Sequence, residues 1–149
     1  FRKWYGNDEY VVNWSGDGKV LAEAGAVMVN EALRFRPMIS WTRVSSGSLA
    51  VRLKPSGFMF DMTGPAAFGL ANKLKFNAAF LNSSVGLMVA RFLSASLDFQ
   101  PGQIATYPII QNEEREPSVN DMVDSCCGLS KTDWDSFETS WDFKRHPLV

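Results

Sequence analysis

The stretch ISWTRVSSGSLAVRLKPSGFMFDM, residues 39–62, predicts the central sheet of this chain. Ile39–Val44 and Leu49–Leu53 are apolar segments on either side of Ser45–Ser48, and apolar and polar residues alternate along the second segment. A period of two is typical of a strand that buries one face. Phe58–Met62 is apolar at all but one position, which favours a third strand at the centre of the sheet. The stretch therefore predicts an antiparallel meander.

The strongest helical signal runs from Asn72 to about Leu93, where apolar residues recur at spacings of three and four. Asn82-Ser83-Ser84 interrupts it and could mark a break between two helices. These patterns predict an α+β fold: a small, mostly antiparallel sheet packed with one long or broken helix, plus a short helical, aromatic-rich C-terminal tail. With 149 residues, 46% of them hydrophobic, the chain is long enough to bury a core of its own.

Shorter patterns add elements before and after these two stretches. Glu9–Trp14 and Tyr107–Ile110 predict two further short strands. Asp17-Gly18 favours a tight turn, because both residues of such a turn must reach a positive φ. Lys19–Leu33 is rich in alanine and predicts a helix, which Pro37 would end.

The composition changes after residue 110. Asn112–Pro117 is a charged linker, Val119–Cys126 predicts a helical segment, and Ser130–Asp133 fits a weak capping box at the start of another. Four aromatic residues then follow closely: Trp134, Phe137, Trp141 and Phe143. We therefore expect a body over residues 1–110 and an acidic, aromatic tail over residues 111–149 that docks on the body or on a part of a longer protein.

The net charge of −1 hides an uneven distribution along the chain. From Arg34 to Arg91 there are eight basic residues and one acidic residue, whereas residues 111–149 hold four basic and nine acidic residues. A basic body beside an acidic tail is typical of a domain that binds a polyanion such as nucleic acid. On charge alone, a chance distribution of surface charge explains the pattern equally well.

No catalytic motif is present in the sequence. The prolines are never adjacent, so the Asn/Asp-Pro-Pro-aromatic turn of amino-methyltransferases is missing. Gly16–Lys19 follows a predicted strand, but Leu21 stands where a dinucleotide-binding loop needs glycine, and a turn is the better interpretation. The one histidine, His146, supports neither a Ser-His-Asp triad nor a structural zinc site. Asp133, Asp135 and Glu138 are more typical of a solvated acidic face than of a metal site.

The cysteines and the apolar segments of the sequence indicate in which cellular compartment the protein is expected. Cys126 and Cys127 are adjacent, where a disulfide is strained, and a reducing cytoplasm fits best. No apolar run approaches the roughly 18 residues that a membrane span needs, so we expect no membrane partner. The chain begins at Phe1 rather than at a methionine, and we expect an internal or C-terminal piece of a longer protein, although a processed end would give the same start.

Four stretches together resemble one protein family. They are Phe1–Trp14, Ile39–Ser48 with Gly57–Gly64, Phe80–Ser83 with Leu97–Ile104, and the most distinctive, Ser130–Leu148. This combination resembles the adenine-specific DNA methyltransferases of BREX-type phage-defence systems, in the region after their catalytic core. That region is similar to the TaqI-like specificity, or target-recognition, domain. Lys19–Arg36 and Met122–Leu129 depart from the family pattern.

The resemblance implies a function for the longer protein. It implies methylation of adenine N6 in double-stranded host DNA, which distinguishes host from phage. It also implies S-adenosylmethionine as cofactor, bound by an N-terminal catalytic domain that this chain lacks. The resemblance assigns no catalytic residue, cofactor-binding residue or metal ligand to this chain.

We hypothesise that the sheet and its loops face duplex DNA. The residues predicted to contact phosphates are Arg43, Arg52, Lys54, Lys73, Lys75 and Arg91. Ser45, Ser46 and Ser48 carry hydroxyls suited to phosphate oxygens or base edges. Ordinary solvated charges and a plain turn are the competing interpretations. Asn82 is better interpreted as a helix-break cap than as a base reader, and Trp41 as a core residue than as a wedge in DNA.

An alternative of another class remains open. The chain could be a protein-interaction module that docks other subunits of the defence system, and the acidic, aromatic tail favours that for residues 111–149. An independent single-domain enzyme is a third interpretation, which the missing motifs argue against.

Overall fold

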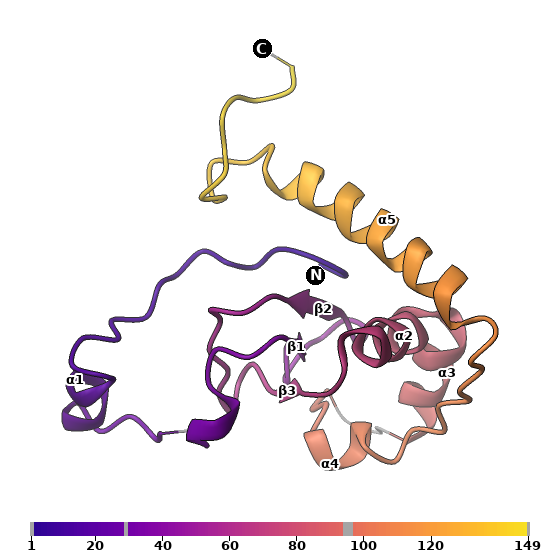
Figure 1. Cartoon of the computed structure of the whole chain (residues 1–149), viewed down its shortest axis with the longest axis horizontal. Coiled ribbons are helices and arrows are strands. Elements are labelled where there is room, and N and C mark those ends of the chain that lie inside the picture. Colours follow the sequence, from indigo (N-terminus) through magenta and orange to yellow (C-terminus); the bar gives the residue numbers. More distant parts are fainter. Residues whose placement is uncertain (1, 29, 94–96, 149) are drawn as a thin grey trace.

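The computed structural model describes residues 2–28, 30–93 and 97–148. In chain order the elements are α1 (Lys19–Glu23), the 3-10 helix η1 (Glu31–Leu33), β1 (Met38–Trp41), β2 (Val51–Lys54), β3 (Ala66–Ala67), α2 (Ala71–Asn82), α3 (Ser84–Leu93), α4 (Pro101–Ile104) and α5 (Glu116–Trp134). The predicted α+β class is confirmed. Figure 1 shows α5 passing α2, with the N-terminal segment between α5 and β2, and α1 at the far end of a long excursion.

The sheet has the strand order β2-β1-β3, and both pairs are antiparallel. The prediction of a third, central strand at Phe58–Met62 is wrong, because β1 is central and β3 lies further along the chain. The cause is local: the Asp61 carboxylate accepts hydrogen bonds from the backbone amides of Thr63 and Gly64. An aspartate that binds amides two and three residues ahead folds the chain into a turn, and pairing starts only after that turn.

One face of the sheet forms the core with α2. The buried residues of this cluster are Ile39, Trp41, Leu49, Val51, Leu74, Ala78, Leu81, Ala90, Phe99, Ile104 and Tyr107. Trp41 lies in the core, as predicted, and its indole Nε1 donates to the carbonyl oxygen of Phe99 at 2.8 Å. A buried indole usually finds such a partner, and here it connects the central strand to the segment before α4.

The predicted break in the long helix is confirmed at Ser83, between α2 and α3. The Ser83 hydroxyl donates to the carbonyl of Phe80 at 2.7 Å and accepts from the amide of Gly86 at 3.0 Å, so one side chain satisfies both helix ends. A Cβ at Gly86 would lie 2.1 Å from the Phe80 carbonyl oxygen, which only glycine avoids. None of the helices in the described ranges could cross a lipid bilayer singly by length and composition, although α2 and α3, bent by 72°, pass that test together.

Asn82 binds the edge strand β2 and does not cap the helix break. Its buried side chain accepts from the backbone amide of Val51 and donates to the carbonyl of the same residue, both at 2.9 Å. The Trp4 amide also donates to the Val51 carbonyl, and the Leu53 amide donates to the Trp4 carbonyl. The outer edge of β2 is therefore paired with an asparagine side chain and with the N-terminal segment.

Several shorter predictions differ from the structure. Glu9–Trp14 and Tyr107–Ile110 are not strands, and the described residues of Lys19–Leu33 form only α1 and η1. Gly25, at a φ of 83°, follows the end of α1 in a conformation that a helix cannot continue. The Asp17-Gly18 turn is confirmed, with φ values of 58° and 81°.

The tail is mostly one long helix. α5 contains the predicted helical segment Val119–Cys126 but continues to Trp134, so Ser130 lies inside it and starts no new helix. The Ser130 hydroxyl instead donates to the carbonyl of Lys3. α5 packs on α2 and the N-terminal segment, where Trp134 is buried and the Arg2 guanidinium lies 4.9 Å from the centre of its ring. The helical part of the tail, α5, thus contacts the body.

Asn82→Ala should destabilise the fold by about 2 kcal/mol, because it leaves the buried amide of Val51 without a partner. Urea unfolding measures the difference. Asn77→Ala is the matched control: the carboxamide oxygen of Asn77 is buried on the same helix without a hydrogen bond, and its loss should cost less than about 1 kcal/mol. Equal losses in the two variants would contradict the anchoring role.

Candidate nucleic-acid interface

The nine residues predicted to contact DNA occupy four places in the fold. Arg43 and the three serines lie in and beside the β1–β2 connection, Arg52 and Lys54 on β2, Lys73 and Lys75 on α2, and Arg91 on α3. The structure does not join them into one free basic surface, because most of the cations already have partners within the chain.

Arg52 and Lys54 are buried, with 6% and 8% of their surfaces exposed. The Lys54 ammonium donates to the carbonyl of Gly6 at 2.9 Å and pairs with Asp8, while Arg52 donates to the Arg2 carbonyl at 3.1 Å. Burial lowers the pKa of both side chains. The expectation that they lie on an exposed strand face is wrong, since the N-terminal segment covers that face.

Lys73 and Lys75 are ion-paired with α5. Lys73 contacts Glu116 at 2.5 Å and Lys75 contacts Asp124 at 2.6 Å. The pKa of the Glu116 carboxyl lies below its usual range, and the hydrogen bond from Lys73 is the largest of the interactions that lower it. The acidic tail therefore neutralises these two lysines of the basic body.

Arg43 is held in a fixed orientation. Its Nε and Nη2 atoms donate to the two oxygens of Asp98 at 2.7 and 2.9 Å, and Gln100 donates to the same carboxylate at 2.9 Å. Hydrogen bonds from Arg43 first, and from Gln100 second, keep the pKa of Asp98 low. A bidentate pair of this kind fixes the guanidinium plane. The remaining Nη1 nitrogen makes no hydrogen bond to any described residue.

The serine loop follows Arg43 directly. The Ser45 amide donates to the carbonyl of Leu97 at 3.0 Å, and the Ser45 hydroxyl accepts from the amide of Gly47 at 3.2 Å. Ser46 is exposed, and Ser48 is half-buried. The loop thus presents a hydroxyl and a backbone turn beside the fixed guanidinium.

Arg91 is an exposed cation of the predicted set, whereas Arg43 is half-buried. It lies in the last turn of α3 and forms no ion pair with any residue in the described ranges. The chain runs on from α3 to Leu97 at the serine loop, through residues outside the described ranges.

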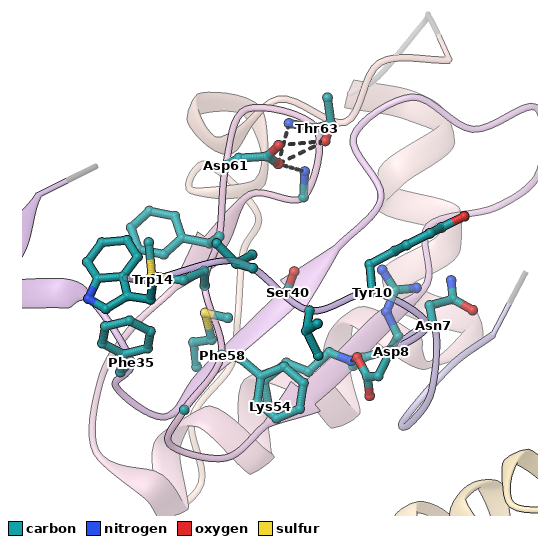
Figure 2. A pocket seen from close by; sticks show the side chains of 18 of the residues that line it. Asn7, Asp8, Tyr10, Trp14, Phe35, Ser40, Lys54, Phe58, Asp61 and Thr63 are labelled. Atoms are coloured by element: carbon teal, nitrogen blue, oxygen red, sulfur yellow. Dashed lines mark hydrogen bonds and ion pairs between the residues drawn. The ribbon is translucent and has the colours of Figure 1, made fainter. Parts of the chain in front are cut away.

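Sequence reasoning missed the partners of Arg43. Asp98 is 55 residues away in the chain, and no local pattern relates the two. It also missed a cavity of about 920 Å³ on the other face of the sheet, lined in part by Tyr10, Trp14, Ser40 and Phe58 (Figure 2).

Within the described ranges, no group of three or more histidine, cysteine, aspartate or glutamate side chains could hold a metal ion. Cys126 and Cys127 are free thiols on α5, and burial raises the pKa of Cys127 to about 11. A thiol with so high a pKa is a poor nucleophile at neutral pH.

Comparison with known proteins identifies the relatives of this chain. No family model matches it. The chain is 35% identical over 158 residues to the adenine-specific methyltransferase PglX of Lacticaseibacillus casei (strain Zhang), an alignment that takes in the whole chain. This chain is a relative of one region of the adenine-specific methyltransferases. The methyltransferase BrxX of Escherichia coli O9:H4 (strain HS) is 33% identical over 156 residues, or 99% of the chain.

These matches confirm the resemblance that the sequence motifs predicted. The chain spans only 13% of the length of PglX and 12% of the length of BrxX. It therefore corresponds to a small part of such an enzyme.

The Arg43–Asp98 pair should give the fold an acid-sensitive contribution. Because the folded pKa of Asp98 lies below its usual value, its contribution to stability is present above about pH 4 and is lost as the pH falls through the folded pKa. Unfolding by urea at a series of pH values should therefore show a shallower acid loss for Asp98→Asn than for the unchanged chain. Glu113→Gln, at an exposed acid, should follow the unchanged chain. Parallel curves for all three proteins would contradict the assignment.

Proposed function

We propose that this chain is the DNA target-recognition part of an adenine-specific DNA methyltransferase of the phage-defence type. The observation that carries the proposal is identity of 33–35% to PglX and BrxX across essentially the whole chain. The sequence has no Asn/Asp-Pro-Pro-aromatic turn, so we assign methyl transfer and S-adenosylmethionine binding to another part of the protein.

The proposed DNA contacts are Arg43, Ser45, Ser46, Ser48 and Arg91. The bidentate pair of Arg43 with Asp98 leaves the Nη1 nitrogen to donate to a phosphate oxygen. Because the pair already orients the guanidinium, little side-chain entropy is lost when Arg43 binds DNA. The serine hydroxyls and the amides of their turn suit the same oxygens or base edges. Contacts of this type fix the protein on the duplex and carry little sequence information by themselves.

The other four predicted contacts take a structural role in this proposal. Arg52 and Lys54 hold the N-terminal segment against β2, and Lys73 and Lys75 hold α5 against α2. To reach DNA, each would have to break these interactions. The proposal therefore relies on directed hydrogen bonds at one loop more than on overall positive charge.

In the longer protein, the serine loop and a catalytic domain would face DNA from two sides. Enzymes that modify a base in duplex DNA turn that base out of the stack, because its reactive atom is not accessible within the helix. We assign this chain the task of holding the duplex in register while the target adenine is turned toward the catalytic domain.

Loss of a phosphate contact should lower the salt dependence of DNA binding. Arg43→Gln and Arg91→Gln should each reduce the slope of log affinity against log salt by about 0.9. Fluorescence anisotropy with a short labelled duplex at several salt concentrations measures this slope.

Two further variants serve as controls. Arg43→Gln combined with Asp98→Asn keeps the local net charge and removes the carboxylate that Arg43→Gln alone would leave unpaired. Lys144→Gln, at an exposed tail lysine, should leave the slope unchanged. A slope that is the same in the unchanged chain and in a protein lacking both Arg43 and Arg91 would refute the assigned contacts.

The second candidate function is that of a protein-interaction module. Exposed apolar side chains on the tail itself favour it. Trp141 is 69% exposed, and Leu129 on α5 is also exposed. Deleting the tail is an unsuitable test, because α5 supplies the partners of Lys73, Lys75 and Arg2.

Trp141→Ser is the sharper test of this second candidate. If the tail docks other defence-system subunits, this variant should lose them in co-purification while the salt slope of DNA binding is unchanged. Phe143→Ser, at a less exposed ring of the same tail, is the matched comparison. Unchanged co-purification of subunits with Trp141→Ser would remove this surface from consideration.

A further inference from the structure

The Glu9–Asn13 segment reads Glu-Tyr-Val-Val-Asn, which favours a β-strand, yet it pairs with no strand among the described residues. Throughout residues 2–28, 30–93 and 97–148, the backbone N–H and C=O groups of this segment make no hydrogen bond. Folded proteins pair most of their backbone polar groups, and a row of unpaired ones is a template for another strand.

The side chains of the segment are also uncovered. Tyr10 is 90% exposed and Val11 77% exposed, and Val12 beside them is exposed as well. Val27, from the loop after α1, adds another exposed apolar side chain. Adjacent exposed aromatic and β-branched residues are typical of a surface that another polypeptide covers.

The cavity lies directly beside this segment. It has a volume of about 920 Å³, and Tyr10, Val11 and Val12 line one side of it. Figure 2 shows Tyr10 and Trp14 on opposite sides of the view, with Ser40 between them and Phe58 and Lys54 below. A strand added to Glu9–Asn13 would therefore have space for side chains that point toward the sheet.

The buried charge of Arg52 at the cavity indicates what kind of side chain the added strand would place there. Arg52 lines the cavity, is almost fully buried, and donates only to two uncharged oxygens, the carbonyl of Arg2 and the hydroxyl of Thr42. In the described ranges no carboxylate forms an ion pair with Arg52. Asp8, which pairs with Lys54, raises the pKa of Arg52, but burial lowers it by more. A buried cation without a direct ion pair is costly, and a carboxylate in contact with it would relieve that cost.

We propose that Glu9–Asn13 is a docking edge onto which an extended peptide segment adds as a β-strand, placing an acidic side chain in the cavity near Arg52. The chain spans 12–13% of the length of its relatives, and we take the segment to be one from the remainder of such a methyltransferase. Main-chain hydrogen bonds would supply affinity, and the cavity would select the side chain.

Duplex DNA fits this edge less well than a peptide does. Asp8, Glu9 and Asp17 lie on or near the segment, so a phosphate backbone that followed the segment would meet several carboxylates. A phosphate backbone also cannot supply the alternating donors and acceptors that a free strand edge pairs with.

The experiment uses this 149-residue chain and overlapping short synthetic peptides that cover the Lacticaseibacillus casei PglX sequence outside the matched region. At least one peptide should bind and slow the hydrogen exchange of alternate amides within Glu9–Asn13, as read by NMR. Changing the acidic residue of that peptide to its amide should weaken binding by about tenfold or more.

Proline substitutions test the backbone contacts. Because neighbouring amides of a strand point to opposite sides, only one of Val11→Pro and Val12→Pro should abolish binding. Val11→Thr keeps the amide and the branched Cβ, and should retain most of the affinity.

Three results would overturn the proposal: no peptide binds, a bound peptide leaves the exchange of these amides unchanged, or a DNA duplex protects them in its place. None of these bears on the salt dependence at Arg43 and Arg91, so the two proposals fail independently.

Discussion

The arrangement of this fold depends on the pairing of Val51 at the outer edge of β2. Its amide and carbonyl point away from β1, and a buried edge cannot leave them unpaired. Asn82 satisfies both groups from α2, and Trp4 adds a second donor to the carbonyl. The same short stretch of backbone therefore fixes the helix that covers the core and the N-terminal segment that closes the sheet.

The distribution of charge follows from that arrangement. Once Trp4 pairs with β2, the residues after it lie over the second face of the sheet, and Arg52 and Lys54 become buried beneath them. α5 then lies along α2 and neutralises Lys73 and Lys75. The basic sequence of the body thus stabilises the contacts between its parts, and little of it remains as free surface charge.

The α+β class, the first two strands and the break at Ser83 could be predicted from the sequence, because each depends on local periodicity or on a local hydrogen bond. The strand at Phe58–Met62 was wrongly predicted because the Asp61 turn overrides the apolar pattern, and the buried Arg52 was wrongly expected on an outer face. The partner of Arg43 could not be found, because it depends on a contact between residues far apart in the chain. The resemblance to the methyltransferase family was confirmed although several local predictions were wrong, because the resemblance depends on matches along the whole chain.

The bend between α2 and α3 has a consequence for the residues on either side of it. Because a Cβ at Gly86 would lie 2.1 Å from the Phe80 carbonyl oxygen, a larger residue there would displace one helix relative to the other. Asn82 and Arg91 lie on opposite sides of the bend, and Asn82 is hydrogen-bonded to β2. A larger residue at position 86 would therefore move Arg91 relative to the sheet.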